Sequence, residues 1–202
     1  MVSYEPFEYS YLLTTGSPTA IRETFTAHKD FAENPDLHEN HQSWLTGISQ
    51  EDTVHMDFSK NISDDLLTVS NSPLQYNEAE GTLTLTANTS SSLSLTLKYY
   101  LSGATLHTDD YSTLQIEYMI PSETTAATEN ARLFPCTGGH FLTDTSTVVD
   151  SPTLISDGQY HTLTVDMTQS SDWDGIIDNI RIDFFQWANP GDTIHIKSIT
   201  LR

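Results

Sequence analysis

Hydrophobic and polar residues alternate with a period of two along most of the chain after residue 54. Leu83 and Leu85 alternate with threonines, and five later stretches repeat the pattern. Their apolar positions are Leu93, Leu95 and Leu97; Leu114, Ile116, Tyr118 and Ile120; Leu163, Val165 and Met167; Ile180, Ile182 and Phe184; and Ile194 and Ile196. Because successive side chains of a strand point to opposite faces of a sheet, this pattern predicts strands with one buried face and one hydrated face.

The last of these stretches changes phase before the C-terminus. Ile199 and Leu201 fall on the opposite parity from Ile194 and Ile196. A β-bulge inserts one extra residue into a strand and shifts the faces that follow it. We therefore predict a bulge near Lys197-Ser198, which returns both apolar pairs to the core.

Turn-forming residues separate the alternating stretches at intervals typical of all-β proteins. They are Glu80-Gly81, Ser102-Gly103, Gly138-Gly139, Asp157-Gly158, Asp174-Gly175 and Asn189-Pro190-Gly191. No helical period follows residue 54, so the alternating strands need a second sheet to cover their apolar faces. The predicted fold is an all-β antiparallel β-sandwich of the jelly-roll type.

The N-terminal part has a different pattern. Ser17 and Pro18 are suited to the N-cap and first position of a helix, and apolar residues follow at nearly helical spacing. Asn34-Pro35 ends this run. We expect an N-terminal extension or linker over residues 1–53 that contains one short amphipathic helix near 18–33. The β-sandwich then occupies residues 54–202.

The composition is strongly acidic, with 28 Asp and Glu against 8 Lys and Arg and a formal charge of −20. Nucleic acids and anionic membranes bind proteins whose basic residues neutralise their phosphates, so we expect neither partner. No apolar run reaches the roughly 18 residues of a transmembrane helix, and the first residues lack a signal-peptide pattern. Cys136 is the one cysteine, which excludes an intramolecular disulfide.

Motifs in the C-terminal half occur in a specific order. Ser156-Asp157-Gly158 precedes a strand, Asp172-Trp173-Asp174-Gly175 precedes the strand containing Ile180-Arg181-Ile182-Asp183, and Asn189-Pro190-Gly191-Asp192 precedes the closing strand. In this order they resemble the galactose-binding-like β-jelly-roll modules of secreted bacterial glycoside hydrolases. These are carbohydrate-binding modules, and the resemblance covers about residues 54–202.

This resemblance implies a non-catalytic module that binds a polysaccharide and targets an attached catalytic domain of a glycoside hydrolase. The acidic surface repels polyanions at long range, so we expect a neutral glycan of plant or microbial cell walls. The resemblance also implies a secreted or cell-surface protein, whose signal peptide we expect outside this sequence. A structural or protein-adhesion β-sandwich without sugar binding is the alternative function.

Alternation also predicts the residues of a candidate sugar site. If Ile180, Ile182 and Phe184 enter the core, the opposite face carries Arg181, Asp183 and Phe185. The same rule turns Gln115 and Glu117 outward, and we expect these two strands to be neighbours. Such polar groups bind sugar hydroxyls, and an aromatic ring packs on the C–H face of a pyranose. Alternatively, Arg181 forms an ordinary ion pair with Asp183 or Glu117.

Trp187 is the expected stacking residue, because it follows this strand in a loop with turn-forming residues. Its neighbour Gln186 is a further candidate for ligand binding. Arg132 and His140 are expected to reach the same face. In contrast, Trp173 lies in the turn that resembles the family scaffold, so we expect it to cover the end of the core.

No cofactor is required by this interpretation, although calcium remains open. Similar modules often bind a structural calcium through an acidic residue in the closing strand, where this chain has Lys197. Asp172, Asp174 and Asp178 match only part of a calcium-loop spacing, so turn formation is the simpler role for them.

An enzyme is the less favoured interpretation. The sequence contains no nucleophile elbow, zinc-protease motif, P-loop or dinucleotide fingerprint. Glu117 and Asp183 are a candidate pair of carboxylates for glycoside hydrolysis, which requires a defined separation between the two groups. We expect a binding module and not an enzyme.

Overall fold

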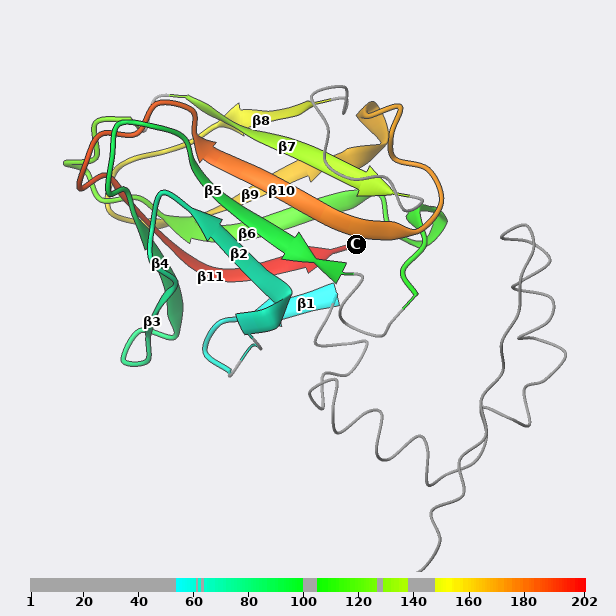
Figure 1. The fold of residues 1–202 in the computed structure, drawn as a ribbon, viewed down its shortest axis with the longest axis horizontal. Coiled ribbons are helices and arrows are strands. Elements are labelled where there is room, and N and C mark those ends of the chain that lie inside the picture. The colour runs from blue at the N-terminus through cyan, green and yellow to red at the C-terminus, as the bar shows by residue number, and fades with distance from the viewer. Residues whose placement is uncertain (1–53, 61, 63, 100–104, 127–128, 138–147) are drawn as a thin grey trace, which may run out of the picture. The chain divides into compact units, whose positions relative to one another are not determined.

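The computed structural model describes residues 54–60, 62, 64–99, 105–126, 129–137 and 148–202, which form two antiparallel sheets (Figure 1). Sheet A contains β1 (His55–Asp57), β3 (Gln75–Asn77), β4 (Thr82–Thr86), β6 (Thr113–Met119), β9 (Tyr160–Asp166) and β11 (Thr193–Leu201). Sheet B contains β2 (Leu67–Ser70), β5 (Leu93–Lys98), β7 (Asn130–Thr137), β8 (Val149–Thr153) and β10 (Ile177–Phe185). The predicted all-β sandwich is confirmed, whereas the helix expected near 18–33 lies outside the described residues.

Short 3-10 turns complete the described secondary structure: η1 (Asp64–Leu66), η3 (Thr108–Asp110) and η4 (Met167–Gln169). Within the described ranges, no helix has the length and apolar character needed to cross a membrane.

Most connections carry the chain from one sheet to the other. The strand order is β3-β4-β11-β6-β9 in sheet A, with β1 also paired to β11, and β2-β5-β10-β7-β8 in sheet B. Consecutive strands are therefore seldom hydrogen-bonded neighbours, which is typical of jelly-roll topology. One consequence matters for function: β6 and β10 lie in different layers of the sandwich (Figure 1).

The core lies between the two sheets and contains the apolar residues that alternation predicted, together with others. Leu83 of β4, Leu95 of β5, Ile116 of β6 and Ile182 of β10 are each fully buried. Burial of one such side chain contributes about 1.5–3 kcal/mol relative to leaving it exposed. The core therefore fixes which side of every strand faces outward.

The bulge predicted in the closing strand is confirmed. The register of β11 against β6 shifts between Ile196 and Ser198. As a result, the apolar residues on both sides of the shift are buried, namely Ile194, Ile196, Ile199 and Leu201. Lys197 sits at the shift and is exposed.

Gly81 occupies a turn that no other residue fits well. Its φ is +64°, and a Cβ at this position would lie 2.7 Å from the Cβ of Ser59. Gly158 also has a positive φ, of +75°, but no atom lies within 4 Å of the place of its missing Cβ. The two glycines therefore share a backbone requirement and differ in the space around them.

We expect Gly81→Ala to reduce the free energy of unfolding more than Gly158→Ala does. Both variants place a Cβ in left-handed backbone, at a cost of about 1–2 kcal/mol, and only Gly81→Ala also forces Ser59 to move. Urea unfolding of the two variants measures the difference. Equal losses would show that Ser59 moves away without cost.

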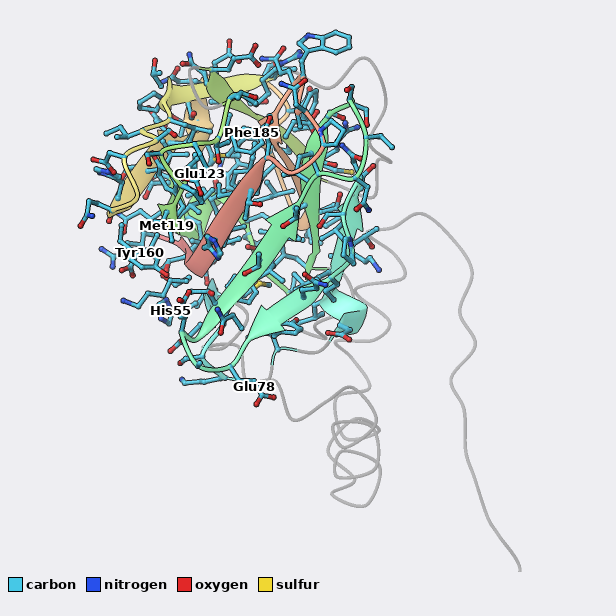
Figure 2. All side chains as sticks on the ribbon, turned by 90° about the vertical axis from the view of Figure 1, so that its left-hand side faces the viewer. His55, Glu78, Met119, Glu123, Tyr160 and Phe185 are labelled. Carbon is cyan, nitrogen blue, oxygen red and sulfur yellow. The ribbon has the colours of Figure 1, made fainter. Side chains whose placement is uncertain are left out.

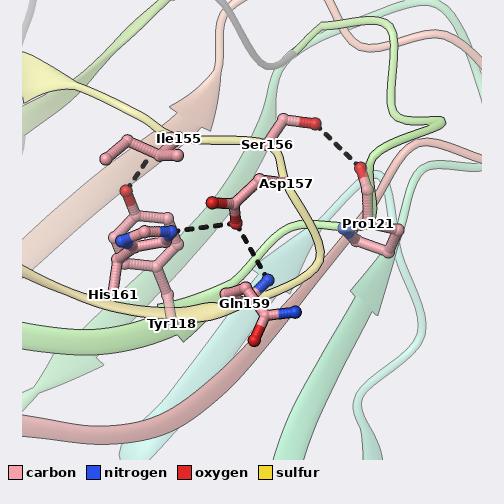
Figure 3. Close-up of polar contacts among 7 residues, drawn as sticks. All are labelled: Tyr118, Pro121, Ile155, Ser156, Asp157, Gln159 and His161. Carbon is pink, nitrogen blue, oxygen red and sulfur yellow. Dashed lines mark hydrogen bonds and ion pairs between the residues drawn. The ribbon is translucent and has the colours of Figure 1, made fainter.

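The loop between β8 and β9 is fastened by hydrogen bonds to the end of β6 (Figure 3). The Ile155 amide donates to the Tyr118 hydroxyl at 3.0 Å, and the Ser156 hydroxyl donates to the Pro121 carbonyl at 2.8 Å. Asp157 of this loop contacts the start of β9, where its Oδ1 lies 2.9 Å from His161 Nε2. The hydrogen bond with His161 is the main cause that holds the pKa of Asp157 below its usual value.

Asp157 gives the fold a defined dependence on pH. Because its pKa is lower in the folded protein, the carboxylate stabilises the fold above its unfolded pKa of about 3.9. This stabilisation is lost as the pH falls through the lower folded value. We expect Asp157→Asn to reduce the free energy of unfolding at neutral pH, and its difference from the wild type to shrink below about pH 4. Urea unfolding across this range tests the expectation, and a pH-independent difference would contradict it.

Candidate functional site

The polar residues predicted to share one sugar-binding floor lie on opposite faces of the sandwich. Arg181 and Asp183 are on β10, on the outer face of sheet B, whereas Gln115 and Glu117 are on β6, on the outer face of sheet A. The prediction that the two strands are neighbours is wrong. Because the hydrophobic core separates them, Glu117 and Asp183 do not form a pair of cooperating carboxylates.

On the outer face of sheet B, residues paired across neighbouring strands form two rows. One row runs through Thr68, Thr96, Arg181 and Phe134. The next row runs through Ser70, Ser94, Asp183, Arg132 and Asp150. This face therefore brings together guanidinium groups, carboxylates, hydroxyls and one aromatic ring.

Arg181 and Asp183 form a bidentate ion pair. Nε and Nη2 of Arg181 donate to the two carboxylate oxygens at 2.7 and 2.8 Å. The Asp183 side chain is only 7% exposed, against 38% for Arg181. Burying a carboxylate without a partner costs free energy. The ion pair with Arg181 is therefore part of what stabilises this face. The sequence left two partners open for Arg181, and the structure selects Asp183.

Phe134 of β7 is the aromatic residue of this face. Its ring is partly exposed, and the guanidinium carbons of Arg132 and Arg181 each lie 5.2 Å from its centre. The sequence predictions included Arg132 but missed Phe134. The signal was present, because buried Ala131 and Leu133 alternate with Arg132 and Phe134 along the strand.

Phe185, predicted as a stacking residue, is instead fully buried. The register of β10 against β5 shifts between Asp183 and Phe185. Both Phe184 and Phe185 consequently enter the core. The prediction that Phe185 lines the outer face is wrong because it assumed uninterrupted alternation.

The two tryptophans of the described part differ as expected. Trp187 is 72% exposed in the loop after β10, next to the partly exposed Gln186. Trp173 is buried, and its indole N–H donates to the Tyr111 carbonyl at 2.9 Å. Trp173 thus belongs to the scaffold, while Trp187 presents a large apolar ring to solvent.

A buried carboxylate holds the loop that carries Trp187. Asp192 accepts hydrogen bonds from the Asn189 amide at 2.7 Å and from the Thr125 amide at 2.9 Å. These bonds connect the loop after β10 to the connection between β6 and β7. An open pocket of about 430 Å³ lies beside them, with Glu123 and Asn189 among its lining residues. Hydrogen bonds therefore tie the loop that carries Trp187 to the neighbouring connection.

The outer face of sheet A carries a separate cluster. Lys197 Nζ lies 2.9 Å from Glu117 Oε1 and 5.7 Å from the ring centre of Tyr160. The hydrogen bond from Lys197 to Glu117 is the main cause that raises the pKa of Lys197. Tyr160 pairs with Met119 across β6 and β9, and Figure 2 shows both at the same edge of the domain. Glu117 is therefore neutralised by a neighbour on its own face.

The remaining site predictions are only partly covered by the structure. His140 lies outside the described residues. Among the residues that are described, no group of three or more His, Cys, Asp or Glu side chains is placed to hold a metal ion.

Comparison with known proteins gives matches to solved structures only. No protein-family profile and no curated protein matches the sequence. A variant of a family 29 carbohydrate-binding module, complexed with mannohexaose, is 12% identical with a TM-score of 0.46, covering 72% of this chain and 87% of that chain. Another variant of that module, complexed with cellulohexaose, is 14% identical with a TM-score of 0.45, covering 73% and 89%. A low-affinity xylan-binding module of family 86 from Roseburia intestinalis is 15% identical with a TM-score of 0.41, covering 70% and 92%.

Proposed function

We propose that this chain is a non-catalytic module that binds a neutral or weakly charged polysaccharide of plant or microbial cell walls on the outer face of sheet B. The observation that carries the proposal is the Phe134 ring, which has the guanidinium carbons of Arg132 and Arg181 each 5.2 Å from its centre. A pyranose presents C–H groups on its faces and hydroxyls around its edge. An aromatic ring flanked by hydrogen-bonding groups complements both features.

The polar groups beside Phe134 are suited to sugar hydroxyls because they are already ordered. Arg181 is held by both oxygens of Asp183, so its orientation is fixed before a ligand arrives. Ordering a side chain on binding costs about 0.5–1.5 kcal/mol. A face that avoids this cost binds better than a flexible one with the same groups.

Trp187 supplies a second apolar surface in the loop that directly follows β10. Its exposure leaves the ring free to pack against a glycan, and the Asp192 hydrogen bonds hold the loop that carries it. Gln186 adds an amide next to this ring. The proposed ligand is therefore a chain with several sugar units and not a single monosaccharide.

We also propose that the module is secreted and targets an attached glycoside hydrolase to its substrate. The ordered motifs from Ser156 to Leu201 support this role, because they resemble modules with that function. A shallow open face binds weakly by itself. Connection to a second binding or catalytic unit raises the effective concentration at the polymer surface.

We expect Phe134→Ala to weaken polysaccharide binding about tenfold, which corresponds to ~1.4 kcal/mol. Trp187→Ala removes the second surface and is expected to weaken binding as well. Tyr160→Ala and Glu117→Gln are matched controls on the opposite face, and we expect them to leave binding unchanged. Affinity electrophoresis against xylan, glucan, mannan, xyloglucan and pectin makes the measurement, with urea unfolding to confirm that each variant is folded.

Other outcomes lead to other functions. If no glycan retards the wild type, the adhesion alternative replaces the proposal. If Tyr160→Ala and not Phe134→Ala abolishes retardation, the ligand binds to sheet A. Release of sugar that disappears in Glu117→Gln would establish an enzyme.

A further inference from the structure

Basic side chains are rare in this protein, yet three of them share the proposed binding face. The described part contains Lys60, Lys98, Arg132, Arg181, Lys197 and Arg202. Arg132 and Arg181 flank Phe134 on the outer face of sheet B. Lys98 is on the same face, because it pairs with Asn179, two residues before Arg181 along β10. Half of the described basic residues thus lie on one face of a protein whose net charge is −20.

The two arginines of this face differ in how they are neutralised. Arg181 is bonded to both carboxylate oxygens of Asp183. Arg132 pairs in register with Asp183 on one side and Asp150 on the other. Nevertheless, it forms no ion pair with either of them, and the contact that the described residues give it is the Phe134 ring at 5.2 Å. Arg132 therefore keeps its charge and its N–H donors for a ligand.

A free guanidinium beside an aromatic ring favours a particular ligand group. Its planar fork donates two parallel hydrogen bonds to the two oxygens of a carboxylate, whereas a neutral hydroxyl offers one oxygen. Packing on Phe134 restricts the orientation of the fork. We infer that Arg132 selects glycans in which a mainly neutral chain carries uronic acid substituents. This inference rests on the proposed function, because it names the ligand class of the same face.

The overall charge limits how acidic that glycan is. A polyuronide carries a carboxylate on every sugar and is repelled by the surplus of acidic residues over the whole surface. An isolated carboxylate bonded to Arg132 gains contact with a cation, whereas acidic residues more than about 8 Å away are largely screened at physiological salt. The glycan that suits this face therefore carries only a few carboxylates along a mainly neutral chain.

Matched polymers test the inference. We compare glucuronoxylan with its carboxyl-reduced form, and β-glucan with the same glucan lightly oxidised at C6. We expect the wild type to bind each acidic form about threefold to fivefold more tightly at low salt, a difference typical of an exposed ion pair. High salt is expected to remove the preference. Affinity electrophoresis or calorimetry gives the affinities.

The variants Arg132→Gln and Lys98→Gln separate the role of Arg132 from general electrostatics. Each removes one positive charge from the same face, and Lys98 lies two residue rows from Arg132. We expect Arg132→Gln to lose the preference for the acidic forms, because it weakens their binding more than it weakens binding of the neutral forms. Lys98→Gln is expected to retain it. Urea unfolding confirms that both variants are folded.

Several results overturn the inference and leave the proposed function intact. Equal binding of neutral and acidic forms by the wild type is one, and loss of the preference in Lys98→Gln as fully as in Arg132→Gln is another. An equal loss of both forms in Arg132→Gln would show that Arg132 positions Phe134 and does not select a carboxylate. If the wild type binds no glycan of either kind, the proposed function itself fails.

Discussion

The packing of two sheets against one apolar core is the constraint on which the rest of this structure depends. Sheets packed face to face lie about 10 Å apart, and every strand turns one side toward that space. The outer faces of sheets A and B are consequently separate surfaces. Whether two polar residues cooperate is decided first by the sheet to which their strands belong, and only then by their spacing in the sequence.

On sheet B this constraint produces a polar face with one deeply placed carboxylate. Asp183 has lost most of its hydration, and the guanidinium of Arg181 replaces that hydration with two short hydrogen bonds. The same guanidinium packs over Phe134. One side chain thus satisfies a buried charge and also fixes the surroundings of the aromatic ring.

Alternation in the sequence was sufficient to predict β4, β5, β6, β9, β10 and β11, most of the positions that they bury and the bulge at Lys197-Ser198, because each depends on the parity of nearby residues. The other five strands of the described part were not predicted. Parity does not specify which strands become neighbours. The placement of β6 and β10 in different sheets depends on pairing between residues far apart in the chain, so Glu117 was assigned to the wrong surface. Phe185 was misplaced by a register shift without a turn residue to mark it. Phe134, in contrast, follows the simple rule and was overlooked.

The pairing of β1 with β11 has a consequence for orientation. His55 lies opposite Thr200, and Arg202 exchanges backbone hydrogen bonds with Thr113 of β6. Both ends of the described sandwich therefore lie in sheet A, whereas Phe134 is in sheet B. The face that carries Phe134 is consequently built from β2, β5, β7, β8 and β10, all of which lie in the interior of the described chain.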